Sequence, residues 1–157
     1  MKGFLKTVLF VVAAAGACWM GGSPGLASVM VQCPGDTDGD CVIDSIDPDH
    51  PNATCMHLGA GDGFVTMADG RPLYIFSFSD LTGVPEADIM DEGMLDAAFP
   101  APLIDLNEGD EFYLNLTNVG MMVRPDLFDP HTVHWHGFPD ASAVFDGVPD
   151  SSISINM

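Results

Sequence analysis

Short stretches in which apolar and polar residues alternate are the feature that most constrains the fold of this chain. Side chains two residues apart share one face of a β-strand, so this period predicts strands with two different faces. In residues 71–80, three aromatic residues share one face and two aliphatic residues share the other, namely Tyr74, Phe76 and Phe78 against Leu73 and Ile75. Residues 102–118 predict two more strands joined at 108–110, and the second alternates in the same way.

Glycine, proline and aspartate separate these stretches. Residues 85–99 fit either a short helix or an extended loop, because Gly93 and the lack of a sustained apolar stripe weaken the helical pattern. Several short strands with such turns favour an all-β fold, and we expect an antiparallel β-sandwich.

Length and charge limit the classes of partner. The chain has 157 residues, of which 47% are hydrophobic, and this suits one domain with an appendage. Acidic residues outnumber basic ones 23 to 4, which gives a net charge of −19. After Lys6 the only basic residues are Arg71 and Arg124, so no basic stripe exists to bind nucleic acid or anionic lipid. Cations are the expected partners.

The amino terminus predicts export. Lys2 and Lys6 precede an apolar run from Val8 to Met20, and small residues follow it. The run is shorter than the about 20 residues that span a bilayer, so residues 1–27 are interpreted as a signal peptide rather than a membrane span. Cleavage is expected after Ala27, and a lipid-modified Cys18 is an alternative. The mature protein would then be periplasmic, on the outer surface or extracellular.

Residues 28–60 are interpreted as an acidic segment with three cysteines. Export permits disulfides, so Cys33, Cys41 and Cys55 are expected to form at most one bridge and to leave one thiol. The spacing leaves the pairing open. His50 and His57 are expected to be loop histidines.

Within this segment, "DTDGDCVIDSID" (36–47) predicts a calcium loop. Acids occupy positions 1, 3, 5, 9 and 12, and position 7 offers a backbone carbonyl, as hard cations require. The stretch resembles the thrombospondin type 3 repeat, which implies calcium binding, but Cys41 stands where an EF-hand has glycine. A solvated acidic spacer is the alternative. The expected ligands are Asp36, Asp38, Asp40, Val42, Asp44 and Asp47.

A second candidate metal site is "HTVHWHG" (131–137). On a strand His134 and His136 would share a face, with Val133 and Trp135 on the other, and His131 would face away as a bystander. Paired imidazoles suit copper, zinc, iron or nickel, so the pair by itself leaves the metal open.

The context of "HWHG" selects among these metals. With "PLIDLNEGDEFYLNLTN" before it and "FDGVPDSSISIN" after it, the stretch resembles the first cupredoxin-like domain of the multicopper oxidases, the family of the laccases. The likeness covers roughly residues 99–157, with a fainter trace back to Gly70. It implies a cupredoxin-like Greek-key β-sandwich over residues 61–157, incomplete at the C-terminus. It also implies that His134 binds the type 2 copper, that His136 binds one of the paired type 3 coppers, and that Asp146 helps proton delivery, although Asp-Gly is also an ordinary turn.

The resemblance also implies ligands that this chain does not contain. A complete oxidase needs a second H-x-H, further histidine motifs and a cysteine for a blue copper, whereas every cysteine here precedes residue 61. We therefore expect the front part of a larger oxidase, which oxidises an unknown electron donor and reduces O₂ to water. It would work with C-terminal domains or by self-association. The isolated chain is expected to be inactive, because two histidines cannot hold three copper ions.

Two other functions remain open. An exported, non-enzymatic copper-binding module would add the soft Met121 and Met122 to the two histidines. A calcium-stabilised secreted interaction module would use the histidines only structurally. Copper titration separates these two functions, and the DNA beyond codon 157 separates both from the oxidase.

Overall fold

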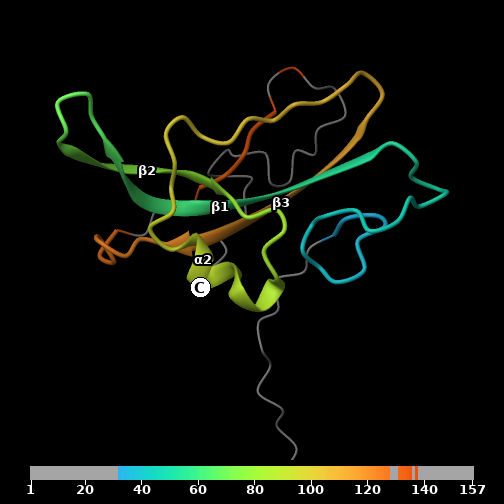
Figure 1. The fold of residues 1–157 in the computed structure, drawn as a ribbon, viewed down its shortest axis with the longest axis horizontal. Coiled ribbons are helices and arrows are strands. Elements are labelled where there is room, and N and C mark those ends of the chain that lie inside the picture. Colours follow the sequence, from blue (N-terminus) through green and yellow to red (C-terminus); the bar gives the residue numbers. More distant parts are fainter. Residues whose placement is uncertain (1–31, 128–130, 136, 138–157) are drawn as a thin grey trace, which may run out of the picture.

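Three strands form one mixed β-sheet in the order β2-β1-β3 (Figure 1). The computed structural model describes residues 32–127, 131–135 and 137. The elements are β1 (Ala53–Thr66), β2 (Pro72–Asp80), the 3₁₀ helix η1 (Glu86–Asp88), α2 (Ile89–Gly93) and β3 (Glu111–Gly120). The all-β expectation is confirmed: the chain is rich in strands, has little helix, and is consistent with a cupredoxin-like β fold. The expected signal peptide, Cys18, His136 and Asp146 lie outside the described residues.

β1 and β2 form an antiparallel hairpin, with register from Leu58↔Asp80 to Thr66↔Pro72. The turn is closed by the Met67 N–H, which donates to the carbonyl oxygen of Arg71 at 2.8 Å. Polar residues at such a turn and apolar residues along the strands are what the alternating pattern predicts.

β3 runs parallel to β1, from Ala53↔Glu111 onward, whereas we expected antiparallel strands. The difference arises because residues 81–110 cross from the β2 edge to the opposite edge before β3 begins, and such a crossover brings the chain back in the direction of β1. The register shifts between Ala60 and Gly61. A side chain at Gly61 would meet Val119 at 2.8 Å, so the close approach of β3 there requires glycine.

The crossover also covers one face of the sheet. Leu81, Ile89 and Val119 form a buried cluster between the crossover and β3. Residues 86–93 are helical and the rest of 85–99 is not, so each of the two expectations for this segment holds in part. A Cβ at Gly93 would lie 2.8 Å from Val119, which explains why glycine ends the helix against the sheet.

Residues 102–107 contain no strand, so the first of the two strands expected in 102–118 is wrong. Leu103 is 83% exposed, and none of the described strands pairs with this stretch. Apolar residues alone do not make a strand when no neighbouring strand accepts their backbone hydrogen bonds.

β1 begins at Ala53 and runs without interruption past residue 60, where we expected the acidic segment to end. Cys55 and His57 therefore lie in the sheet. The prediction of a loop histidine is wrong for His57, which is completely buried. The sequence did not predict this strand because glycine and alanine at residues 59–61 give no alternation of apolar and polar side chains.

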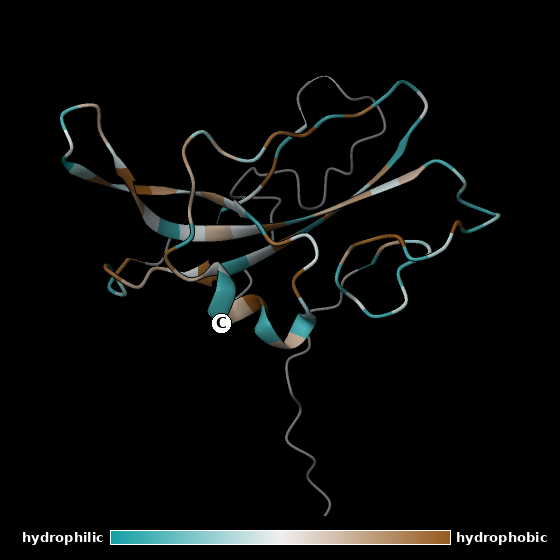
Figure 2. Ribbon diagram, viewed as in Figure 1, coloured by the Kyte–Doolittle hydropathy of each residue, from teal (hydrophilic) through white to brown (hydrophobic). Residues whose placement is uncertain are grey.

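Cys33 and Cys55 form a disulfide, and Cys41 is a free, buried thiol. The expectation of one bridge and one remaining thiol is confirmed. Figure 2 shows hydrophilic residues over much of residues 32–52, which lie beside the end of the sheet. None of the helices in the described part of the chain is long and apolar enough to cross a membrane.

Candidate metal centres

The histidine segment, residues 131–135, is not part of a strand, contrary to our expectation. The side chains of this segment nevertheless alternate between partly buried and exposed, as predicted. His131, Val133 and Trp135 are partly buried, whereas Thr132 and His134 are exposed. The second predicted copper ligand, His136, lies outside the described residues, as does the proposed proton-relay residue Asp146.

Side chains of β3 and β2 hold the buried side of this segment. The His131 N–H donates to Asn118 Oδ1 at 2.7 Å, and Asn118 Nδ2 donates to the carbonyl oxygen of His131 at 3.2 Å. The ring of Trp135 meets Phe112 edge-on at 5.7 Å between centroids. The His131 ring meets Phe78 in the same manner at 5.6 Å. Sequence reasoning missed all three holding residues, because nothing local links them to the histidines.

A buried carboxylate holds the chain just after β3. Asp62 is completely buried in β1, and its Oδ2 accepts hydrogen bonds from the Tyr74 hydroxyl at 2.7 Å and from the Val123 N–H at 2.8 Å. Burial raises the pKa of Asp62, but these hydrogen bonds outweigh it and the net shift is downward. Burial and the bond to Asp62 raise the pKa of Tyr74 to about 12. The Met121 side chain is buried here and that of Met122 is exposed, so these neighbours lie in different surroundings.

The acidic loop brings three of its predicted ligands together. One oxygen each of Asp36, Asp38 and Asp40 lies within 4.8 Å of the others. The pKa of Asp38 is raised, mainly by the charge of Asp40 and then by burial, Asp44 and Asp36. A cation between the three carboxylates would reduce this repulsion on Asp38.

The other predicted ligands make different contacts. Asp44 Oδ2 accepts hydrogen bonds from the N–H and the hydroxyl of Thr37, which lower the pKa of Asp44. Asp47 Oδ1 accepts the Asp49 N–H at 2.9 Å. Val42 donates its own N–H to Asp40 Oδ1 at 2.8 Å. The structure thus groups Asp36, Asp38 and Asp40 but does not bring Asp44 or Asp47 into that cluster.

Cys41 adopts the backbone conformation that glycine has at this position of an EF-hand. Its φ is 69°, in the left-handed region, and its N–H donates to Asp36 Oδ2 at 2.8 Å. The replacement of glycine by cysteine therefore keeps the turn. Cys41 Sγ accepts a hydrogen bond from Asn115 Nδ2 at 3.5 Å, and burial raises the pKa of its thiol. Cys41 Sγ lies within 4.8 Å of both sulfurs of the Cys33–Cys55 bridge.

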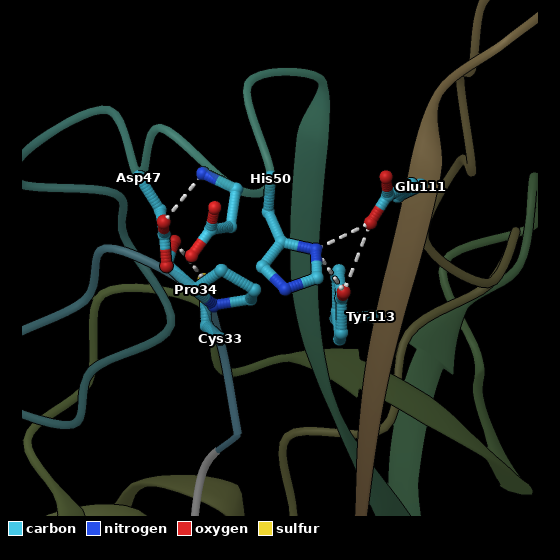
Figure 3. A network of polar contacts seen from close by, with 7 residues as sticks. Cys33, Pro34, Asp47, His50, Glu111 and Tyr113 are labelled. Atoms are coloured by element: carbon cyan, nitrogen blue, oxygen red, sulfur yellow. Dashed lines mark hydrogen bonds and ion pairs between the residues drawn. The ribbon is translucent and has the colours of Figure 1, made fainter.

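A polar network ties the end of the acidic segment to β3 (Figure 3). His50 Nδ1 lies 2.7 Å from Glu111 Oε2, and the Tyr113 hydroxyl lies 3.1 Å from each of these atoms. The bond to Glu111 raises the pKa of His50. Only the alternation in β3, which puts Glu111 and Tyr113 on one face, could have hinted at this network in the sequence.

Comparison with known proteins addresses the histidine segment. The sequence profile of the family described as multicopper oxidase matches residues 88–156, a range that contains α2, β3 and the histidine segment. Over this range the chain is similar to the multicopper oxidase family. The predicted likeness to this family is thereby confirmed, and this family implies copper as the metal.

Two laccases extend this result. Laccase-5 of Trametes versicolor and Laccase-5 of Trametes villosa are each 37% identical to this chain over 65 residues. The matched stretch covers 38% of this chain but only 12% of either laccase. No solved structure matches the chain.

The multicopper oxidase match begins at residue 88, after the N-terminal features of the chain. It leaves out the acidic loop, β1 and β2, although β1 and β2 supply Asp62 and Phe78 to the surroundings of the histidine segment. The sheet therefore combines a strand inside the multicopper oxidase match with two strands outside it.

Proposed function

We propose that this chain is the copper-binding N-terminal part of a multicopper oxidase, with His134 and His136 as two ligands of its copper cluster. The observation that carries the proposal is the presentation of His134. It lies inside the family match, on the exposed side of a segment whose other side is fixed to the sheet.

The donor chemistry fits copper. Imidazole nitrogen is a common copper ligand, and an exposed imidazole on a fixed backbone can meet a metal without exposing the core. Among the described residues, His134 is not part of a group of three potential ligands, so a complete site needs donors beyond them. His136 is the expected partner, and further ligands would come from other domains or from other copies of the chain.

In the complete protein, His134 and His136 would help to hold copper, which would supply the redox chemistry for reducing O₂ to water with electrons from an unknown donor. This chain would contribute imidazoles that hold the metals in place. Asp146 would deliver protons near the cluster. The chain alone is expected to show no oxygen uptake above that of free copper, because two histidines cannot fix three metal ions.

Copper titration of the purified 157-residue chain tests the ligands. Replacing His134 and His136 together by alanine should abolish binding of Cu²⁺, measured by calorimetry. The matched control is a double replacement of His50 and His57 by glutamine, which removes the same number of imidazoles elsewhere. Equal affinity of the parent and the His134/His136 variant would disprove the assignment.

We also propose that Asp36, Asp38 and Asp40 bind Ca²⁺, with Val42, Asp44 and Asp47 as further ligands of the loop. The left-handed Cys41 and the grouped carboxylates support this. Calcium should then slow proteolysis of residues 28–60, and Asp38→Ala should remove that protection. Asp49→Ala, which makes the same charge change outside the loop, should keep it. Equal cleavage of the parent chain with calcium and with chelator would exclude the site.

Export by a signal peptide at residues 1–27 is a further proposal, which the Cys33–Cys55 disulfide supports because such bonds persist in oxidising compartments. The mature chain would begin at Ser28 with the acidic segment, and the copper domain would follow; β1 crosses the boundary expected at residue 60, so the two parts share that strand. Sequencing of the exported protein should find Ser28 at its start. A lipid-modified start at Cys18 would contradict cleavage after Ala27.

A further inference from the structure

Asn118 gives His131 the two hydrogen bonds that a neighbouring strand would give. Its side-chain amide accepts the His131 N–H at 2.7 Å and donates to the His131 carbonyl at 3.2 Å. A primary amide carries the same donor and acceptor as a peptide unit, so it can replace a strand partner at one residue. This explains how the segment is held beside the sheet although it is not one of its strands.

A second contact holds the other end of the segment. Phe112 and Asn118 are both at even positions of β3, so their side chains emerge on the same face. His131 lies at Asn118 and Trp135 at Phe112, and the segment therefore runs opposite to β3 across that face. His134 stands between these two points on the exposed side.

We infer that Asn118 and Phe112 are positioning residues that hold His134 in the orientation in which it binds copper. The inference rests on the proposed role of His134. A metal ligand binds more tightly when its backbone and ring direction are fixed in advance, and residues behind the ligands supply that order. Asn118 fixes both backbone groups of His131, and Phe112 fixes the ring of Trp135, the direct neighbour of His134.

The experiment uses the full 157-residue chain and Cu²⁺ alone. Asn118→Leu removes both hydrogen bonds at similar size, and Asn118→Asp keeps an acceptor for the His131 N–H but loses the donor. Asn115→Leu is the matched control, since Asn115 lies on the same strand but contacts Cys41 on the opposite face. Affinity is measured by titration, the geometry of the bound copper by electron paramagnetic resonance, and the order of residues 131–135 by amide hydrogen exchange without metal.

We expect Asn118→Leu to weaken copper binding by about 10- to 100-fold, the usual range for residues that support metal ligands. The copper affinity of Asn118→Asp should lie between those of Asn118→Leu and the parent. The copper spectrum of Asn118→Leu should broaden or split, because the imidazole is no longer held in one orientation. Asn115→Leu should keep the parent affinity and spectrum.

Two results would overturn the inference. One is a copper affinity and a copper spectrum that are unchanged in Asn118→Leu. If Asn118→Leu does not fold, the same two measurements on Asn118→Asp decide. The other is equal hydrogen exchange of residues 131–135 in the parent and the Asn118 variants. Copper binding that persists in His134→Ala would instead contradict the proposed function, and the exchange measurement would then decide on the Asn118 contact by itself.

Discussion

The acidic loop and the histidine segment are both candidate metal centres, but they are held in different ways. The acidic loop is held largely from within: Asp36 accepts three of its own backbone N–H groups, from Asp38, Gly39 and Cys41. The histidine segment is held from outside, by side chains of β2 and β3. The comparison shows that spacing in the sequence can encode the first kind of site, whereas the second exists only once the sheet has formed.

β3 connects the two regions because its successive side chains point to opposite faces of the sheet. Odd positions contact the N-terminal side: Tyr113 meets His50, Asn115 meets the Cys41 thiol, and Thr117 meets His57. Even positions contact the histidine segment through Phe112 and Asn118. Substitutions on one face should therefore disturb one region and spare the other.

The largest effect is expected from the disulfide. Replacing Cys33 and Cys55 together by serine opens a loop with a sequence separation of 22 residues. The entropy that the bridge removes from the unfolded chain corresponds to about 3 kcal/mol of unfolding free energy. Urea unfolding measures this loss. Cys41→Ser leaves the bridge intact and should lose clearly less unfolding free energy. If the two variants unfold alike, the bridge does not secure the N-terminal region.

A second effect concerns pH and His57. His57 is buried in β1, where its Nε2 lies 2.8 Å from Thr117 Oγ1, and burial lowers its pKa from the ordinary 6.5. The unfolded chain therefore binds the proton more readily, so stability should be complete above pH 6.5 and fall as the pH decreases toward the lower folded pKa. His57→Gln, which cannot titrate, should flatten this part of the stability profile.

His50 is the control for this prediction, because its pKa is shifted in the opposite direction to that of His57. The pKa of His50 is raised by Glu111, so its contribution is complete below pH 6.5 and is lost as the pH rises through the folded pKa. His50→Gln should leave the acid side of the profile unchanged. An identical acid loss in the parent and in His57→Gln would assign the sensitivity to other groups, such as the buried Asp62.

The sequence predicted those parts that depend on local spacing. The alternation of residues 112–117 is confirmed by their partners on opposite faces. The cysteine in place of the EF-hand glycine left the turn at residue 41 open, and Cys41 keeps that turn. The parallel pairing of β1 and β3, the burial of His57 and the Asn118 contact were not predicted. Each depends on where a distant strand lies, and such placement leaves no period in the sequence around the residue concerned.

A smaller effect is expected from Phe112→Leu. The change removes an edge-on aromatic contact with Trp135, and such pairs contribute about 0.5–1.5 kcal/mol. Trp135 should become more exposed, which shifts its fluorescence to longer wavelength; a Trp19→Phe background leaves Trp135 as the only tryptophan. The N-terminal region should keep its resistance to proteolysis, because Phe112 lies on the other face of β3. A matching loss of that resistance would show that the two faces are coupled.

The smallest effect is expected from His131→Ala, and it separates the backbone of this residue from its ring. The ring lies against Phe78, but Asn118 bonds only the backbone N–H and carbonyl of His131, and alanine keeps both groups. The segment should therefore stay in place, and the affinity for Cu²⁺ should fall by at most about fivefold, since such a ring contact contributes about 1 kcal/mol. Calorimetric titration of His131→Ala beside Asn118→Leu checks this directly. If His131→Ala loses as much affinity as Asn118→Leu, the imidazole of His131 is itself a ligand or the main anchor, and the histidine segment is held by its own side chains in the way that the acidic loop is.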